Sequence, residues 1–414
     1  MFRTCSVYSA EHFKSYILIL FIFSVFYLYG KYNVGNDSTI SEWLINYEGG
    51  FTKRGLIGQI AISISELLNF SLRQSIFYFQ IFSIGIYYLL LINFFKSVKF
   101  NKIILLSIFT PIFLLYPVAE IEVLGRKEIF IFSFFITYLT LQDFRIRKYF
   151  RIFLLPFLML IWEPVIFFFT FWLIIDYIEG VFQRDYKSLF KYLSTFIPAI
   201  LVGIYIILNP MTESSHKNMA FFLKENFNES CYMSCALLLH KSSIYLQFAA
   251  NFTSFSFEIF LRYFFIILIG FGPLFILIKF SHFKKLNYKI FILLITPQIL
   301  ILFMMMSDWG RIVNIFYTFS IISFLYLYKK KLLIIDNLIE ENFFVKILNK
   351  KKIFILFFII FCFGWNPKTS LTGDVATNPL WKIPYNASKK VFGFESFRLL
   401  QDHPLVEWHK ENIE

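Results

Sequence analysis

The stretch QSIFYFQIFSIGIYYLLLINFF, residues 74–95, contains no charged side chain in 22 positions. A helix of roughly 20 apolar residues is long enough to cross the hydrocarbon core of a bilayer. Charged residues stand on both sides of it, with Arg73 before and Lys96 after. The stretch therefore predicts a membrane-spanning helix, and the rest of the chain follows the same pattern.

The whole chain of 414 residues is strongly apolar. Hydrophobic residues make up 58% and charged residues 16%, against roughly 25% charged residues in an average soluble domain. The formal charge of +13 is spread over short loops between apolar segments, so anionic lipid headgroups explain it better than a nucleic acid does. Composition thus predicts a polytopic membrane protein whose partner is the lipid bilayer and not a nucleic acid.

Roughly nine apolar windows of near-spanning length, one of them at 102–118, alternate with charged loops. A further stretch, 152–178, is interrupted by Ile161-Trp162-Glu163-Pro164, because proline disfavours helix at the residue before it. We interpret this stretch as a re-entrant hairpin or as two abbreviated spans. The expected fold is an all-α integral membrane helical bundle of about 11 spans, including the broken pair at 152–178, in a single domain over 1–414.

Basic residues concentrate in cytoplasmic loops, and this rule sets the orientation of the spans. It assigns the loop with Arg147 and Arg151 to the cytoplasm, and it places the N-terminus inside and the C-terminus outside. Apolar residues at helical spacing predict two amphipathic interfacial helices, one from Leu56 to Asn69 outside and one over 332–348 inside. The periplasmic segments are then the first loop 31–73, the large loop 209–256 and the tail 366–414.

Cysteines and histidines show no pattern typical of a metal or redox centre. The four cysteines form no CxxC pair and the six histidines no HxxxH pair, so we predict no structural metal. Cys231 and Cys235 lie close together in the large outer loop, and the sequence leaves open whether they are bonded. The absence of a P-loop and of a GxGxxG motif argues against a nucleotide-driven pump, and we expect no cofactor.

Three short polar clusters interrupt the apolar sequence, and the predicted topology puts all three on the outer face. They are 48–55 (Glu-Gly-Gly-Phe-Thr-Lys-Arg-Gly), 120–128 (Glu-Ile-Glu-Val-Leu-Gly-Arg-Lys-Glu) and 307–311 (Ser-Asp-Trp-Gly-Arg). Carboxylates beside cations and glycines can hold a phosphorylated sugar carrier and deprotonate an acceptor hydroxyl. Interface anchors and local ion pairs are the alternative interpretation of the same residues.

The candidate site residues come from these clusters and from the break in 152–178. Glu48 and Asp308 are candidates for the base that deprotonates the acceptor. Glu163 is costly at membrane depth unless it is paired, and we expect it to orient an arginine. Cations of the three clusters are expected to bind the diphosphate of a lipid carrier: Lys53, Arg54, Arg126, Lys127 and Arg311.

Residues 48–56, together with Trp162-Glu163 and Asp308-Trp309-Gly310-Arg311, look like membrane proteins encoded in bacterial surface-polysaccharide clusters. Among these the chain most resembles the Wzy-type O-antigen or capsule repeat-unit polymerases, in overall architecture and in these motifs. The resemblance implies glycosyl transfer on undecaprenyl-diphosphate-linked oligosaccharides at the periplasmic face of the bacterial inner membrane. It also implies a chain-length regulator as a partner.

Two other functions stay open from the sequence. A GT-C type glycosyltransferase that uses a polyprenyl-phosphate sugar resembles this chain in its long first outer loop, where Asp37 or Glu48 would be the catalytic acid. A flippase for lipid-linked oligosaccharide is the transport alternative. Transporters of this kind carry polar residues inside several spans and often show repeated halves, whereas most of the expected spans here are uniformly apolar in the middle.

Overall fold

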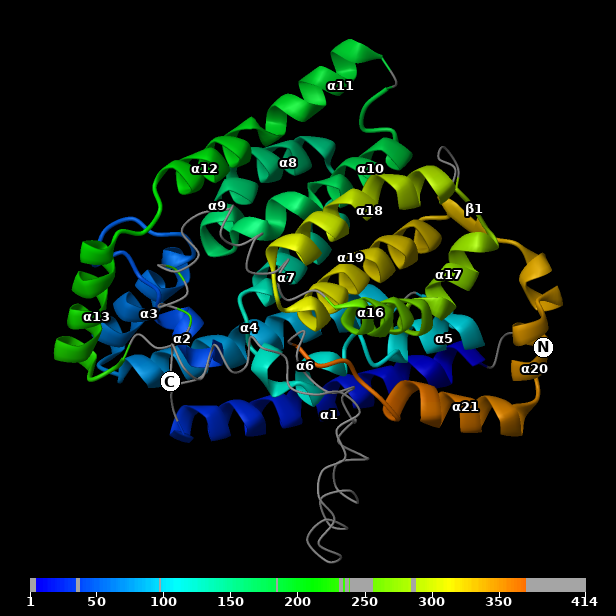
Figure 1. The fold of residues 1–414 in the computed structure, drawn as a ribbon. Coiled ribbons are helices and arrows are strands. Elements are labelled where there is room, and N and C mark those ends of the chain that lie inside the picture. The colour runs from blue at the N-terminus through cyan, green and yellow to red at the C-terminus, as the bar shows by residue number, and fades with distance from the viewer. Residues whose placement is uncertain are drawn as a thin grey trace, which may run out of the picture. The chain divides into compact units, whose positions relative to one another are not determined.

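The computed structural model describes residues 5–34, 38–96, 98–183, 185–230, 256–283 and 288–369, together with Ser234 and Leu238. Most of this part of the chain is helical, which confirms the expected all-α class (Figure 1). The chain divides into two compact units. We call residues 10–97 and 124–246 the N-terminal unit, and residues 1–9, 98–123 and 247–414 the C-terminal unit.

The N-terminal unit places the first outer loop against a broken helix. In this unit α3 packs against α2, α4 and α9, and α4 also packs against α7. Its elements are α1 (Cys5–Val34, of which residues 5–9 belong to the other unit), α2 (Ser38–Leu44), α3 (Gly55–Leu68), α4 (Leu72–Phe95), α7 (Glu128–Thr140), α8 (Phe144–Tyr149), the π-helical turn η2 (Phe150–Leu154), α9 (Leu155–Ile161), the 3₁₀ helix η3 (Glu163–Phe168), α10 (Phe169–Glu179), α11 (Tyr186–Leu193), η4 (Ser194–Phe196), α12 (Ile197–Leu208) and α13 (Glu213–Phe227).

The C-terminal unit is built around α19, which is buried along nearly its whole length and runs beside α18 (Figure 1). Strands β1 and β2 pair antiparallel, with Ser281 opposite Ile335. The elements of this unit are α5 (Lys102–Phe109), α6 (Tyr116–Ala119), η1 (Ile121–Val123), α16 (Phe257–Gly270), α17 (Gly272–Lys279), β1 (Ser281–Phe283), α18 (Tyr288–Met305), α19 (Trp309–Lys329), β2 (Leu333–Ile335), η5 (Asn337–Glu341), α20 (Phe343–Leu348) and α21 (Lys351–Phe363).

Four helices among the described residues are long and apolar enough to cross a membrane, namely 11–33 of α1, α4, the run of α11, η4 and α12, and α19. The pair α16 and α17, bent by 55°, is a fifth candidate. These helices support a membrane protein, but the expected count of about 11 spans is not confirmed. Several expected spans are short helices instead, and the window 102–118 holds the 8-residue α5 followed by turns and α6.

The break expected within 152–178 is present. Helix α9 ends at Ile161, Trp162 is extended with φ −157° and ψ 98°, and η3 begins at Glu163. Pro164 occupies the first turn of η3, where the missing backbone N–H breaks no hydrogen bond. The interruption holds Glu163 at the junction of two short helices, and this position matters for the site described below.

Residues 332–348 do not form the single amphipathic helix that the sequence predicts. The segment is divided into β2, η5 and α20. The carboxylate of Asp336 accepts a hydrogen bond from the N–H of Leu338, and the side chain of Asn342 accepts one from the N–H of Phe344. Each of these caps starts a new short helix, and together they outweigh the apolar periodicity.

Some predicted features fall on residues that the structure does not describe. Asp37, Cys231 and Cys235 are among them, and so is the tail from 370 onward. Within the large outer loop the structure describes α13 and the residues up to 230. The amphipathic helix of the first loop corresponds to α3, whose last residues Leu67 and Leu68 are exposed apolar side chains.

Candidate functional site

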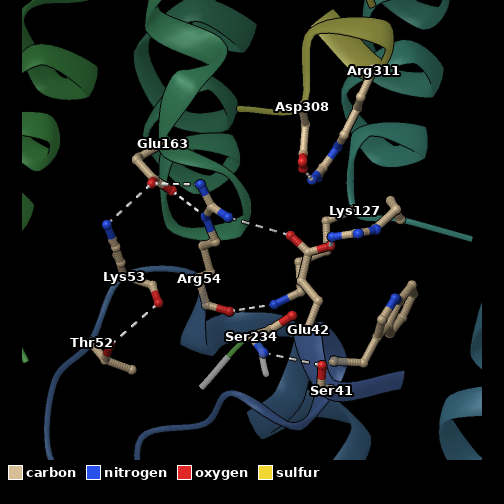
Figure 2. Close-up of polar contacts among 12 residues, drawn as sticks. Ser41, Glu42, Thr52, Lys53, Arg54, Lys127, Glu163, Ser234, Asp308 and Arg311 are labelled. Atoms are coloured by element: carbon tan, nitrogen blue, oxygen red, sulfur yellow. Dashed lines mark hydrogen bonds and ion pairs between the residues drawn. The ribbon is translucent and has the colours of Figure 1, made fainter. Parts of the chain in front are cut away.

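Arg54 lies at the centre of a group of charged side chains in the N-terminal unit (Figure 2). Its Nε and Nη2 donate hydrogen bonds to the two carboxylate oxygens of Glu163, at 2.7 and 2.8 Å. Lys53 approaches the same carboxylate, with Nζ 3.9 Å from Oε1 of Glu163. The break between α9 and η3 therefore supplies a carboxylate that fixes the Arg54 guanidinium in a bidentate pair.

Glu42 of α2 joins Arg54 to a second arginine. Its Oε1 lies 3.6 Å from Nη1 of Arg54, and its Oε2 lies 3.3 Å from Nη1 of Arg126. The Glu42 side chain is only 1% exposed, and a buried carboxylate is stable when cations pair with it. These contacts are longer than the bidentate pair, so they are the ones that an incoming anion would replace most easily.

Lys127, the residue directly before α7, is the last member of the group. Its side chain is buried, and its Nζ donates a hydrogen bond to the backbone carbonyl of Arg54 at 2.5 Å. Burial lowers the pKa of the Lys127 amine to about 7, against the opposing pull of the Glu42 carboxylate and with the help of the Arg54 charge. The lowered pKa makes the charge of the group dependent on pH. We call Glu42, Lys53, Arg54, Arg126, Lys127 and Glu163 the Arg54 cluster.

The backbone of Arg54 is strained. The residue has φ 65° and ψ 10°, in the left-handed region, and caps the N-terminus of α3. A non-glycine residue there costs on the order of 1–2 kcal/mol. Two hydrogen-bonded contacts stabilise this conformation of Arg54. Lys127 donates to its backbone carbonyl, and Glu163 accepts from its side chain. Strain of this kind concentrates at functional sites, and the N-terminus of α3 also favours an anion.

The glycines of the 48–55 cluster allow close packing within the protein. A Cβ atom on Gly55 would lie 2.4 Å from the ring of Tyr47, and one on Gly49 would lie 2.0 Å from the carbonyl oxygen of Ser215 in α13. Gly50 has φ 111°, a conformation that glycine adopts at no steric cost. These glycines therefore fix the loop that presents Arg54, whereas the sequence suggests that they let the backbone approach a ligand.

Glu48 makes a different contact. It is exposed, and its Oε1 accepts a hydrogen bond from Nε2 of Gln59 in α3 at 2.7 Å. Gln59 in turn accepts a hydrogen bond from the N–H of Tyr47 at 3.0 Å. Glu48 thus keeps an accessible carboxylate next to the loop, while Glu42 takes the buried position beside the arginines.

Glu42 is the residue of this group that sequence reasoning missed. It lies in α2, inside the run Ser41-Glu42-Trp43-Leu44-Ile45. A single carboxylate among apolar neighbours in a short helix is a signal of a buried acid, because such a side chain needs a cation when the helix packs. The sequence therefore carries a signal for Glu42, although it is weaker than that of the three polar clusters.

Asp308 and Arg311 belong to the C-terminal unit, at the start of α19. Nη1 of Arg311 lies 3.4 Å from Oδ2 of Asp308. Arg311 is buried, whereas the Asp308 side chain is 31% exposed. Between them, Trp309 donates a hydrogen bond from Nε1 to the carbonyl of Phe303 at 2.8 Å. The motif therefore offers one accessible carboxylate beside a fixed guanidinium.

The first residues of the tail pack onto this motif. The N–H of Gly310 donates to the carbonyl of Thr369 at 3.1 Å, and a Cβ atom on Gly310 would lie 1.9 Å from the carbonyl oxygen of Lys368. Nζ of Lys368 lies 3.6 Å from Oε2 of Glu120. The predicted 120–128 cluster is thus divided, since Glu120 belongs to this unit and Arg126 and Lys127 belong to the other.

The Arg54 cluster has the composition of an anion site. It holds four cationic side chains and two carboxylates, and the buried Glu128 next to Lys127 brings the carboxylates to three. Two arginines that share the longer contacts of Glu42 suit binding of a phosphate group. Within the described part of the chain, no group of three or more His, Cys, Asp or Glu residues is placed to hold a metal ion. No family model matches the chain, and no curated protein or solved structure was found to match it.

Proposed function

We propose that the protein is a glycosyltransferase of the bacterial inner membrane that polymerises undecaprenyl-diphosphate-linked repeat units at the periplasmic face. The observation that carries the proposal is the environment of Arg54. Its backbone is strained, its guanidinium is held by Glu163, and the buried Glu42 links it to a second arginine. A protein keeps such an arrangement when a fixed guanidinium is needed for an anionic ligand.

The neighbourhood of the Arg54 cluster supports a lipid-linked ligand. Arg54 caps α3, whose exposed leucines Leu67 and Leu68 are typical of a helix lying in the headgroup region of a membrane. A polyprenyl diphosphate has its charge at that depth and its chain in the bilayer. The diphosphate would replace the contacts of Glu42 with Arg54 and Arg126, which are the longest charge contacts of the two arginines.

The reaction breaks the bond between the anomeric carbon of the donor glycan and the diphosphate oxygen, and forms a glycosidic bond to an acceptor hydroxyl. Arg54 and Arg126 would stabilise the negative charge of the departing diphosphate. A base takes the proton of the acceptor hydroxyl and must reach it. Glu48 is an accessible carboxylate of the same unit and keeps this proposed role, whereas the buried Glu42 serves to position the arginines. Asp308 lies in the C-terminal unit and stays a candidate base on the sequence pattern alone.

A polymerase binds two lipid-linked glycans, one as donor and one as acceptor. Besides the Arg54 cluster of the N-terminal unit, the C-terminal unit offers a carboxylate beside a cation in Asp308 and Arg311. The proposal includes a topology of about 11 spans, with short helices such as α7 and α9 as abbreviated spans. It also includes a chain-length regulator as a partner.

A second candidate function is favoured by one observation. Glu42 is a carboxylate of the first outer loop, and it lies inside the cationic cluster. A GT-C type transferase that takes its sugar from a polyprenyl monophosphate would use an acid of that loop, and Glu42 would then be the residue instead of Glu48 or Asp37. This enzyme would add one sugar and would not join repeat units.

The glycan profile of a polysaccharide-producing host separates these functions. Deletion of the gene should leave a single repeat unit on the lipid core. A truncated repeat would instead indicate the single-sugar transferase, and complete repeats trapped in the cytoplasm would indicate a flippase. Each of these results has its own position on a gel, so the deletion tests the reaction directly.

Complementation with Arg54→Ala then tests the site. Arg73→Ala is a matched control, because Arg73 makes a bidentate pair with Glu229 at 2.8 and 2.6 Å, and both arginine side chains are 18% exposed. We expect Arg73→Ala to restore the wild-type ladder and Arg54→Ala to fail at equal protein abundance in the membrane. A wild-type ladder from Arg54→Ala would remove Arg54 from the proposed site.

A further inference from the structure

An apolar hollow of about 220 Å³ lies within the C-terminal unit. Residues of α16, α17, α18 and α19, with Phe271 between α16 and α17, form its walls, and among the lining side chains only Thr296 and Ser320 are polar. The hydroxyl of Thr296 bonds to the carbonyl of Ile292 in its own helix. The hollow is smaller than the roughly 300–1,000 Å³ of pockets that enclose compact ligands. Its size suits a stretch of hydrocarbon chain.

The bend between α16 and α17 shapes this hollow. Pro273 stands in the first turn of α17, after a turn of 55° from α16. Phe271 at the bend lines the hollow and packs its ring against Tyr317 at a centroid distance of 4.8 Å. Because Ile267 before the bend and Leu274 after it both line the hollow, the bend itself forms one wall.

The rim of the hollow is apolar and open. Leu300 of α18 is 56% exposed and Phe275 of α17 is also exposed, and both line the hollow. Helices α16 and α17 together are apolar enough to cross a membrane. An opening between apolar helices at membrane depth admits a lipid chain and excludes a charged solute.

One end of the hollow reaches the Asp308 motif. Phe303 lines the hollow and its ring lies 4.8 Å from that of Trp309. From Trp309, the lining residues Val313, Phe316 and Ser320 follow along one face of α19, at spacings of four, three and four. At 1.5 Å per residue the face extends over about 16 Å. A tryptophan at the outer end and apolar residues below it match an amphiphile with its headgroup beyond Trp309.

We propose that this hollow binds the isoprenoid chain of a polyprenyl phosphate lipid, with the phosphate beyond Trp309 on the side of Asp308 and Arg311. The choice of a polyprenyl lipid over a phospholipid rests on the proposed function. Ser320 is a small side chain in the wall of the hollow, and its hydroxyl is buried without a hydrogen-bond partner in the described part of the structure. A larger side chain at Ser320 would fill the space.

Native mass spectrometry of the purified full chain tests this site, with undecaprenyl phosphate and phosphatidylglycerol added at equal concentration. Wild type should retain undecaprenyl phosphate, and Ser320→Phe should retain at least tenfold less. Leu300→Trp narrows the opening from an exposed position, so it should lower retention without a risk to folding. Leu268→Phe, on the exposed side of α16 outside the hollow, is the matched control and should behave as wild type.

Equal retention of the two lipids by wild type would show an ordinary bilayer contact and overturn the proposal. Full retention by both Ser320→Phe and Leu300→Trp would overturn it as well. The measurement needs no glycan transfer, so its outcome is separate from the test of Arg54. An unchanged ladder with Arg54→Ala would remove Arg54 from the proposed site and leave a positive lipid result standing.

Discussion

The N-terminal unit holds two buried groups of arginines and carboxylates that differ in how completely they are satisfied. The second group centres on Asp176 of α10, which accepts hydrogen bonds from Arg151 at 2.7 Å and from Tyr192 at 2.8 Å. Tyr138 and Arg147 also bond to the same carboxylate. We call these five residues, with Glu179 and Thr195, the Asp176 cluster.

The Asp176 cluster is closed, and the Arg54 cluster is open. Asp176, Arg147 and Arg151 are almost entirely buried, and their bonds run to side chains and carbonyls of neighbouring helices. In the Arg54 cluster, Glu163 and Lys53 are partly exposed, and the contacts of Glu42 are 3.3 and 3.6 Å. A closed network of charges holds helices together, whereas charged groups of an open network can still bind a ligand.

The largest effect is expected in the closed cluster. Asp176→Ala would leave Arg147 and Arg151 buried without their shared carboxylate, which costs about 3–5 kcal/mol. We expect a large fall in the thermal unfolding midpoint of the purified protein, or a loss of folded protein in the membrane. Glu163→Ala, in the open cluster, should lower the midpoint far less. Equal losses from the two variants would erase the distinction between the clusters.

A second prediction concerns function. Glu163→Gln keeps the shape of the side chain but replaces charge-assisted bonds to Arg54 with weaker ones, a loss of about 1–2 kcal/mol. Polymerised glycan should fall about tenfold for each 1.4 kcal/mol lost, as measured by ladder density. Glu229→Gln changes the partner of Arg73 in the same way and should leave the ladder intact. Parallel changes in the two variants would argue that the open cluster has no special role.

The strained backbone of Arg54 gives a third, smaller effect. Arg54→Gly and Arg54→Ala both remove the guanidinium, but only glycine adopts the left-handed conformation at no steric cost. We expect Arg54→Gly to be more stable than Arg54→Ala by about 1 kcal/mol, with both inactive. Chemical denaturation of the two variants measures the difference. A more stable alanine variant would show that the backbone at this position carries no strain.

The smallest effect is a dependence of stability on pH. The pKa of Lys127 falls from its ordinary 10.5 to about 7 in the folded protein. Between these values the unfolded chain binds one proton more than the folded chain, so this residue makes stability rise with pH in that window. Lys127→Met lacks this contribution. The unfolding midpoint of wild type relative to Lys127→Met should therefore increase from pH 7 to pH 9, and a flat or falling difference would contradict the burial of a neutral amine.

The sequence predicts the class of fold and one local feature of the site correctly, because both depend on local patterns. Long apolar runs predict helices, and Pro164 predicts the interruption that places Glu163 between α9 and η3. Residues 332–348 show the limit of this reasoning, since the caps at Asp336 and Asn342 divide a segment whose apolar spacing favours one helix. Hydropathy alone does not weigh a cap against periodicity.

Burial of individual charged side chains is what the sequence does not show. Arg147 and Arg151 predict a cytoplasmic loop by their charge, yet in the structure both are buried and bonded to Asp176. The sequence marks Glu42 as an acid among apolar neighbours, but it does not show that Arg54 and Arg126 are its partners. Whether a charge is solvated or paired depends on which other residue meets it, and the pairs of the two clusters span 12 to 110 positions. The spacing of charged residues along the chain does not show which of them pair in the fold.

Direct binding of undecaprenyl diphosphate to the purified protein in lipid nanodiscs tests the central claim, that the Arg54 cluster is an anion site. Wild type and Arg73→Ala should bind the lipid with the same affinity, and Arg54→Ala should bind it at least tenfold more weakly. Equal affinity of wild type and Arg54→Ala would contradict the claim and leave the Arg54 cluster as a second structural network.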